Sequence, residues 1–481
     1  MVLNSLPFAA FFLIFLAVIL VLPKKLRRLW LFAGNCLFYL TAEPGAFLLL
    51  LASSLLIWLS GLGIEKFSES KTGMPKDGSP KRAELFLCLI PILWNVGLLI
   101  FFKYAGLIGN VLKKTDAVFS AKDILIPLGL SFYTLRCISY VRTVWKRELD
   151  AVRNPLDVFN YVSFFPQIIS GPIEKPVNFF CEFEAFSQKN LRDFERIWQG
   201  FLLFVWGLFQ KIVLAERLSL ITAHLYGSFQ QYGFWELLFA SAAYTLQIYC
   251  DFGGYSDMSR GVSAMLGFST MRNFRQPYLA AGIKSFWRRW HISLTDWLTA
   301  TIYIPLGGSK KGLLRKYVNV IIVFLISGLW HGSTLNFVFW GLLHAVFQIA
   351  EDMWERRLKP LPGWIRRLIT LAEVNFAWIF FNAGGLNRGF RIIRQMFSRF
   401  SLPAAFDPGL IPGNLVVLAA GLIILTMVDV LHEKKVPVQQ KTAALPLPLR
   451  WLIILGLFWS VIMLGIYGIG YDTSGFIYAR F

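Results

Sequence analysis

Two of the five histidines in this 481-residue chain stand where proton-transfer chemistry is possible. His331 lies in residues 327–332 (SGLWHG), where one apolar run ends and another begins. An ionisable side chain among apolar residues is costly at membrane depth and often marks a reactive centre or a pathway. An imidazole also titrates near neutral pH, which suits a general base. The competing interpretation is a neutral histidine whose ring bonds to a backbone carbonyl.

The second histidine, His291, precedes His331 by forty residues, in residues 286–294 (FWRRWHISL). Arginine and tryptophan also collect at the headgroup boundary without any function, so an interfacial amphipathic helix would have a similar sequence. We predict His331 and His291 as the catalytic pair. His344, thirteen residues after His331, is interpreted as a packing residue or as one that contacts the catalytic residues without touching the substrate.

Other familiar sites find little support. The five cysteines include no closely spaced pair, and no HExxH motif, P-loop or dinucleotide fingerprint occurs, so no metal site is predicted. The turn at 307–312 (GGSKKG) resembles a phosphate-binding turn in composition only. It is either a basic cytoplasmic turn or a landing site for the phosphates of coenzyme A.

The composition places these residues in a membrane. Only 16% of the residues are charged, 56% are hydrophobic, and the mean hydropathy is +0.56. A soluble protein of this length would carry about a quarter charged residues. The net charge of +20 comes from short basic clusters between apolar runs, which is typical of membrane topology and not of nucleic-acid binding.

About eleven apolar runs have spanning or near-spanning length. They occupy residues 6–22, 45–64, 84–102, 124–141, 197–215, 234–250, 317–330, 334–350, 368–382, 414–431 and 451–470. Shorter pieces at 29–40, 158–170 and 255–267 suit re-entrant or half-membrane helices. We therefore predict an all-α, polytopic integral membrane bundle that forms a single domain over 1–481, with its core at 124–350 and C-terminal helices at 366–481.

Basic clusters at 24–28, 66–82, 142–153 and 282–316 are predicted to face the cytoplasm, with the stretch from 68 to 82 as a flexible loop. Asp251 and Asp257 lie in an apolar stretch. Because buried carboxylates need partners, we expect an internal polar network with nearby arginines and a structural role.

Several motifs together resemble the membrane-bound O-acyltransferase (MBOAT) family, in its bacterial alginate O-acetyltransferase branch. The resemblance spans nearly the whole chain and rests on residues 131–135 (SFYTL), 164–173 (FFPQIISGPI), 255–258 (YSDM), 286–294 (FWRRWHISL), 303–308 (YIPLGG), 329–332 (LWHG) and 476–478 (FIY). The chain departs from the family pattern at Thr299 and Ala300, where an Arg-Asp pair is expected.

The resemblance implies a multi-pass enzyme of the bacterial cytoplasmic (inner) membrane, whose bundle encloses a funnel or tunnel. It would move an acyl group, expected to be acetyl, from a cytoplasmic thioester to a hydroxyl of an extracytoplasmic polysaccharide or of an SGNH-type partner acyltransferase. His331 would be the base, and His291 would position the thioester or stabilise the oxyanion. The expected donor is acetyl-coenzyme A or an acyl-carrier thioester, bound by Arg288, Arg289, Lys310 and Lys311, with no permanently bound cofactor.

Two other functions stay open from the sequence. D-alanyl transfer to teichoic acid from a carrier protein is the alternative within the enzyme class. A transporter or flippase is the alternative from another class, because broken helices and buried carboxylates also occur there.

Overall fold

The computed structural model describes residues 1–69, 82–112, 126–359, 361–400 and 406–467. Within these ranges every regular element is a helix and no strand occurs, which confirms the all-α prediction. Most of the predicted loop at 68–82 and the whole motif at 476–478 lie outside the described residues.

The contacts divide the chain into two compact units, each built from segments far apart in sequence. Among the described residues, unit 1 comprises Met1–Gly200 and Ser259–Met271, and unit 2 comprises Phe201–Met258 and the described residues between 272 and 467. Both predicted catalytic histidines belong to unit 2.

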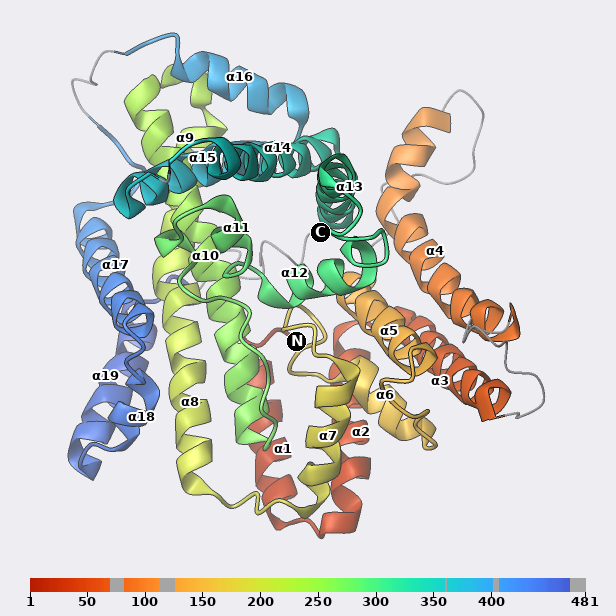
Figure 1. Ribbon diagram of the computed structural model, residues 1–481. Coiled ribbons are helices and arrows are strands. Elements are labelled where there is room, and N and C mark those ends of the chain that lie inside the picture. Colours follow the sequence, from red (N-terminus) through yellow and green to blue (C-terminus); the bar gives the residue numbers. More distant parts are fainter. Residues whose placement is uncertain (70–81, 113–125, 360, 401–405, 468–481) are drawn as a thin grey trace. The chain divides into compact units, whose positions relative to one another are not determined.

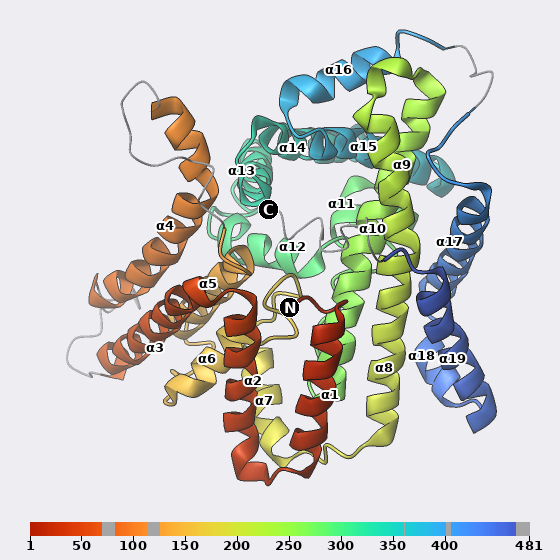
Figure 2. The same cartoon turned by 180° about the vertical axis from the view of Figure 1, so that it is seen from behind.

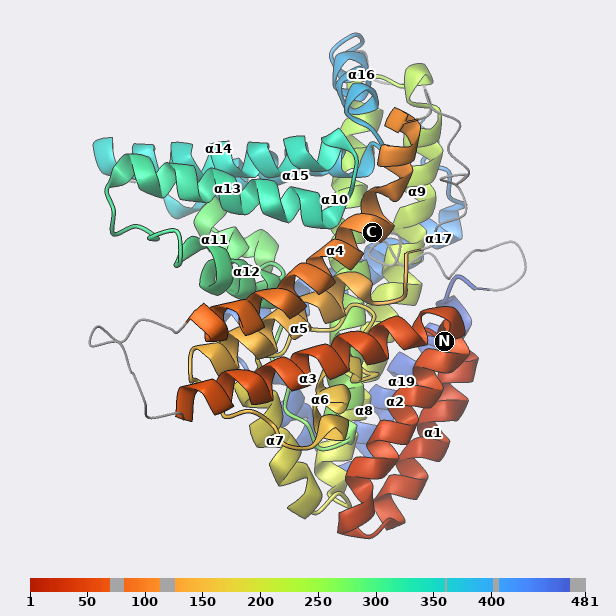
Figure 3. The ribbon, with the colours of Figure 1, turned by 90° about the vertical axis from the view of Figure 1, so that its right-hand side faces the viewer.

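Unit 1 is built around the N-terminal helices. They are α1 (Leu6–Val21), α2 (Arg27–Ala42), α3 (Phe47–Glu69), α4 (Arg82–Leu112), α5 (Leu130–Trp145), α6 (Pro155–Ser163), α7 (Pro176–Gln188) and the start of α8 (Phe194–Leu208). Figure 2 shows α1 beside α2, and Figure 3 shows α3, α4 and α5 side by side. The buried guanidinium of Arg136 donates to the Tyr161 carbonyl and to Gln167, so this cation is satisfied inside the unit.

Unit 2 carries the remaining helices. They are α9 (Glu216–Gly227), most of α10 (Phe234–Met265), α11 (Ile283–Trp287), α12 (Ile292–Leu298), α13 (Leu313–His331), α14 (Leu335–Arg357), α15 (Gly363–Asn382), α16 (Leu386–Met396), α17 (Pro412–Glu433), α18 (Val438–Ala443) and α19 (Leu447–Leu464). Helix α14 packs against both α13 and α15 (Figures 1 and 3).

Six helical stretches in the described ranges are long and apolar enough to cross a membrane. They are Pro44–Phe67, Arg82–Tyr104, Phe194–Gly227, Leu313–His331, Pro412–Glu433 and Leu447–Leu464. Other predicted runs also form helices, but α1 has only 16 residues, and α10, α14 and α15 are long enough but less apolar. The chain is therefore a multi-pass membrane protein, in which six of the spans are clear from length and composition in the described residues.

Glycines bring α13 and α14 into close contact. A Cβ on Gly328 would clash with the backbone carbonyl of Phe337, and one on Gly341 would clash with that of Phe324. Each helix thus lacks a side chain where the other's backbone approaches. The glycine before His331 serves helix packing, and this packing places His331 at the end of α13 beside α14.

The carboxylates of α10 form a polar network in unit 2. Asp251 lies 2.6 Å from the ammonium of Lys211, and Asp257 accepts a hydrogen bond from Gln210 at 3.3 Å. The network was expected, but the partner of Asp251 is a lysine. Lys211 also pairs with Glu216 at 2.9 Å, so a buried cation is shared between two carboxylates.

Candidate active site

His331 is enclosed by aromatic rings. The side chain ends α13 and is 2% exposed. Ring centres lie 4.9 Å away in Trp330, 5.1 Å away in Trp340 and 5.3 Å away in Phe381. These rings come from α13, α14 and α15, so three helices define the orientation of the imidazole.

His291 occupies a strained backbone position before α12. Its φ of 43° and ψ of 53° are left-handed, a region that residues other than glycine seldom adopt. The backbone of the following residue, Ile292, donates to the Asn273 carbonyl at 2.9 Å and holds this turn in place. Such strain persists where the surroundings enforce it, and it often coincides with functional sites.

The side chain of Asn273 defines the tautomer of His291. Its Oδ1 accepts the Ser293 backbone N–H at 3.2 Å and lies 3.2 Å from His291 Nδ1. Since an amide oxygen only accepts, Nδ1 carries the proton and donates it, which leaves a lone pair on Nε2 of the neutral ring. Burial lowers the pKa of His291 to about 3, so the ring is neutral at pH 7.

The two predicted catalytic histidines meet at a common neighbour. The ring of Trp330 lies 6.1 Å from that of His291 and 4.9 Å from that of His331. Residues forty positions apart in sequence therefore share one indole in unit 2.

A cavity of about 280 Å³ lies near these residues, although neither histidine lines it, and we call it the cationic cavity. Three basic side chains line it, from Lys284, Arg288 and Lys316. Trp287, Phe324 and Ser327 also contribute to its wall, and Ser327 precedes His331 by one turn of α13. An elongated molecule with an anionic end could occupy it, with the charge at the basic residues and an uncharged part along the aromatic wall.

The predicted donor-binding residues occupy different surroundings. Arg288 lines the cationic cavity. Arg289 makes a bidentate ion pair with Glu433, at 2.7 and 3.0 Å. Lys310 and Lys311 are exposed on the turn before α13, which Asn319 holds by donating to the Gly308 carbonyl at 2.9 Å.

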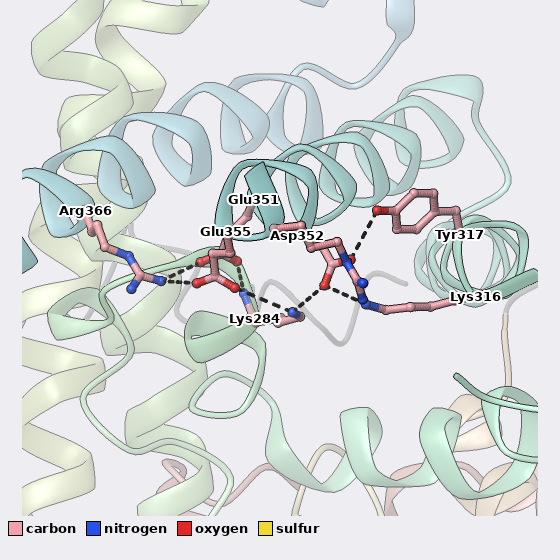
Figure 4. Close-up of polar contacts among 8 residues, drawn as sticks. Lys284, Lys316, Tyr317, Glu351, Asp352, Glu355 and Arg366 are labelled. Atoms are coloured by element: carbon pink, nitrogen blue, oxygen red, sulfur yellow. Dashed lines mark hydrogen bonds and ion pairs between the residues drawn. The ribbon is translucent and has the colours of Figure 1, made fainter. Parts of the chain in front are cut away.

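Sequence reasoning did not predict Lys284 and Lys316 as donor-binding residues, because they are brought together by a carboxylate on another helix. Asp352 Oδ1 accepts from Lys284 Nζ at 2.9 Å and from Lys316 Nζ at 2.5 Å (Figure 4). Its Oδ2 accepts from Arg356 and Tyr317. Burial alone would raise the pKa of Asp352, but the bonds from the three cations lower it well below its usual value, so the carboxyl stays ionised.

The network continues toward α15. Arg366 binds Glu351 at 3.2 Å and Glu355 at 2.6 Å, and Glu351 accepts the backbone N–H of Lys284 at 2.9 Å (Figure 4). A Cβ on Gly282, whose φ is 130°, would clash with Glu351, so the glycine is needed for this contact. Helices α11, α13, α14 and α15 are thereby tied together next to the cationic cavity.

The described residues contain no group of three or more histidine, cysteine, aspartate or glutamate side chains that could hold a metal ion. The fold and the site together define a multi-pass helical membrane protein with two buried histidines beside a cation-lined cavity.

Residues 35–392 match the membrane-bound O-acyltransferase family (MBOAT), and the chain belongs to it. It is an O-acyltransferase. The chain is 31% identical to a probable alginate O-acetylase AlgI of Pseudomonas putida, over 83% of this chain and 80% of that protein. It is also 31% identical to a peptidoglycan O-acetyltransferase of Helicobacter pylori (77% and 73%), and 27% identical to a teichoic acid D-alanyltransferase of Bacillus subtilis (52% and 66%).

Proposed function

We propose that this enzyme transfers an acetyl group from a cytoplasmic thioester to a hydroxyl of a polysaccharide outside the bacterial cytoplasmic membrane. The observation that carries the proposal is the contact of His291 and His331 with one indole, beside the cationic cavity, in a chain of this family. The relatives named for alginate and for peptidoglycan support a polysaccharide acceptor. A partner acyltransferase that passes the acetyl group on is the second form of the same proposal.

His331 acts as the base in this scheme. A neutral imidazole takes the proton of the acceptor hydroxyl as its oxygen attacks the thioester carbonyl carbon. The tetrahedral intermediate then breaks its C–S bond, and the departing sulfur takes the proton from the imidazole. The products are an ester and a free thiol, so the reaction consumes no net proton.

His291 acts by positioning. Stabilising the oxyanion would require an N–H at Nε2, but the bond to Asn273 places the ring proton on Nδ1. The remaining lone pair suits a hydrogen bond from an O–H or N–H group of a substrate. This geometry supports the positioning role of His291 over the oxyanion role.

The cationic cavity is the proposed site of the donor. Lys284, Arg288 and Lys316 would pair with phosphate groups, which both coenzyme A and a phosphopantetheine carrier possess. The aromatic wall would take the uncharged arm and bring the thioester toward His331. In this proposal Lys284 and Lys316, which line the cavity, replace Lys310 and Lys311 as the donor-binding lysines.

D-alanyl transfer to teichoic acid is the second candidate. The match to a teichoic acid D-alanyltransferase covers 52% of the chain at 27% identity, against 83% at 31% for the alginate relative. Coverage and identity both favour acetyl transfer. Stable co-purification with a phosphopantetheinyl carrier protein would reverse this order.

The test uses purified protein in lipid nanodiscs with labelled acetyl-coenzyme A. We expect release of free thiol and label on an added polysaccharide, and we expect His331→Ala and His331→Gln to abolish both. His224→Ala is the matched control, because that ring is partly exposed and bonds to Tyr232 at 3.0 Å, away from the site. Full activity in the His331 variants would refute the assignment of the base.

A further inference from the structure

His344 is a buried histidine that its packing alone does not explain. The side chain is fully buried in α14, yet neither ring nitrogen has a hydrogen-bond partner among the described residues. A buried polar atom without a partner costs about 1–3 kcal/mol, and native proteins contain few such atoms. A phenylalanine would fill a similar space without that cost.

The same feature recurs in three indoles around His344. The ring of Trp287 lies 4.9 Å from that of His344, the ring of Trp340 lies 4.9 Å away, and the ring of Trp378 lies 6.3 Å away. The Nε1 atom of each indole is buried and has no hydrogen-bond partner in the described part of the chain. Five unsatisfied polar atoms are thus concentrated within one aromatic cluster, which we call the indole cluster: His344, Trp287, Trp340 and Trp378.

The indole cluster is continuous with the active site. Trp287 and Phe324 line the cationic cavity, and Phe324 also contacts the His344 ring, with centres 6.0 Å apart. Trp340 contacts both histidines, with its ring centre 4.9 Å from that of His344 and 5.1 Å from that of His331. A chain of ring contacts therefore leads from the wall of the cationic cavity through this cluster to His331.

We propose that the indole cluster is a binding subsite for an uncharged group that both accepts and donates hydrogen bonds. A neutral imidazole offers one donor and one acceptor, and the indoles offer donors only. An ion would lose its hydration in this aromatic surrounding without gaining a counter-charge. A neutral amide or hydroxyl fits the available donors and acceptor.

Two substrates of the proposed reaction carry such a group, and this step rests on the proposed function. The arm of a phosphopantetheine thioester contains amides, and the acceptor contains hydroxyls. Because Trp287 lines the cavity assigned to the donor, we assign the subsite to an amide of the donor arm. His344 is then a binding residue for the thioester, and it does not take part in proton transfer.

The first measurement is the binding of pantetheine, which has the amides but neither the phosphates nor an acyl group. We expect His344→Phe to raise the dissociation constant for pantetheine by roughly tenfold or less, which corresponds to the loss of one hydrogen bond. Trp287→Phe should have a similar effect. His344→Gln restores a donor and an acceptor and should recover much of the affinity. Unchanged binding in both His344→Phe and Trp287→Phe would overturn the proposal.

A second measurement separates this role from packing. Since His344→Phe removes two unsatisfied atoms, its melting temperature should equal or exceed that of the wild type while binding weakens. His224→Phe is the matched control: it removes a partnered ring, so it should not raise the melting temperature or alter pantetheine affinity. A large fall in melting temperature for His344→Phe, with Trp287→Phe binding normally, would show a structural role and refute the subsite.

The source of the group is decided by steady-state kinetics. A raised KM for the thioester with an unchanged KM for the polysaccharide supports the donor arm, and the reverse pattern refutes that assignment. The pantetheine titration does not depend on turnover, so it can fail while the acetyl transfer itself succeeds, and the two proposals remain distinguishable.

Discussion

The imidazole of His331 and the indole of Trp340 meet edge to face, with ring centres 5.1 Å apart and ring planes at 89°. The two residues come from α13 and α14, which approach closely through Gly328 and Gly341. Aromatic contacts of this kind contribute about 0.5–1.5 kcal/mol beyond the area they bury. The candidate base is therefore oriented by helix packing, and changes to that packing should alter activity.

Trp340 should be needed for both stability and activity. Trp340→Ala removes a side chain that is 1% exposed, and the cavity it leaves should lower the free energy of unfolding by about 3–5 kcal/mol. Trp340→Phe keeps an aromatic face against His331, so its loss of stability should be clearly smaller. Melting temperatures and acetyl transfer measured on the same samples check this. Equal stability of Trp340→Ala and the wild type would contradict the packing described.

The α13–α14 contact gives a second prediction. In Gly341→Ala the new methyl group meets the Phe324 carbonyl, and since backbone cannot move freely, we expect a loss of about 1–3 kcal/mol together with reduced transfer. Gly456→Ala is the control in α19, where no atom lies within 4 Å of the new Cβ. That change should increase stability by up to about 1 kcal/mol, as alanine does in a helix interior. If both variants lowered the melting temperature equally, the close approach of α13 and α14 at Gly341 would not explain the loss of stability.

The two sets of lysines make different predictions for donor binding. Lys316→Ala removes a charge from the wall of the cationic cavity, so the KM for a phosphate-bearing thioester should rise, by roughly tenfold for the loss of one charge-assisted bond. The double change Lys310→Ala with Lys311→Ala removes two charges from an exposed turn and should have a smaller effect. Kinetics with acetyl-coenzyme A at fixed ionic strength compare them. A larger rise in KM for the Lys310/Lys311 double variant would contradict the cavity assignment and support the sequence-based prediction that these two lysines bind the donor.

Much of this architecture follows from local sequence. Apolar runs predicted the helices, and the motifs around His291 and His331 predicted two residues that the fold brings to one indole. In the described residues six helical stretches are apolar enough to count as clear spans, while helices such as α14 and α15 are long but less apolar. An apolar run alone does not distinguish a membrane span from a helix buried within protein.

The missed residues depend on tertiary contacts. Asn273 sets the tautomer of His291 from a non-helical segment eighteen positions earlier, and no pattern marks it. Arg289 pairs with Glu433, which lies 144 positions later in the sequence. Asp352 binds one lysine on α11 and another on α13. Ion pairs over such separations depend on how the helices pack. No regular spacing in the sequence indicates which charged residues will meet.

The buried, neutral state of His291 predicts how stability depends on pH. Its pKa is about 3 in the folded protein and about 6.5 when unfolded, so below pH 6.5 the unfolded chain binds a proton that the folded chain does not. This histidine therefore lowers the free energy of unfolding by up to about 1.4 kcal/mol for each pH unit between roughly 6 and 3. His291→Asn cannot take up this proton, so the melting temperature of the variant should fall less steeply than that of the wild type between pH 7 and pH 4. If the melting temperatures of the variant and the wild type fell in parallel over that range, folding would not lower the pKa of His291, and the effect of burial described here would be wrong.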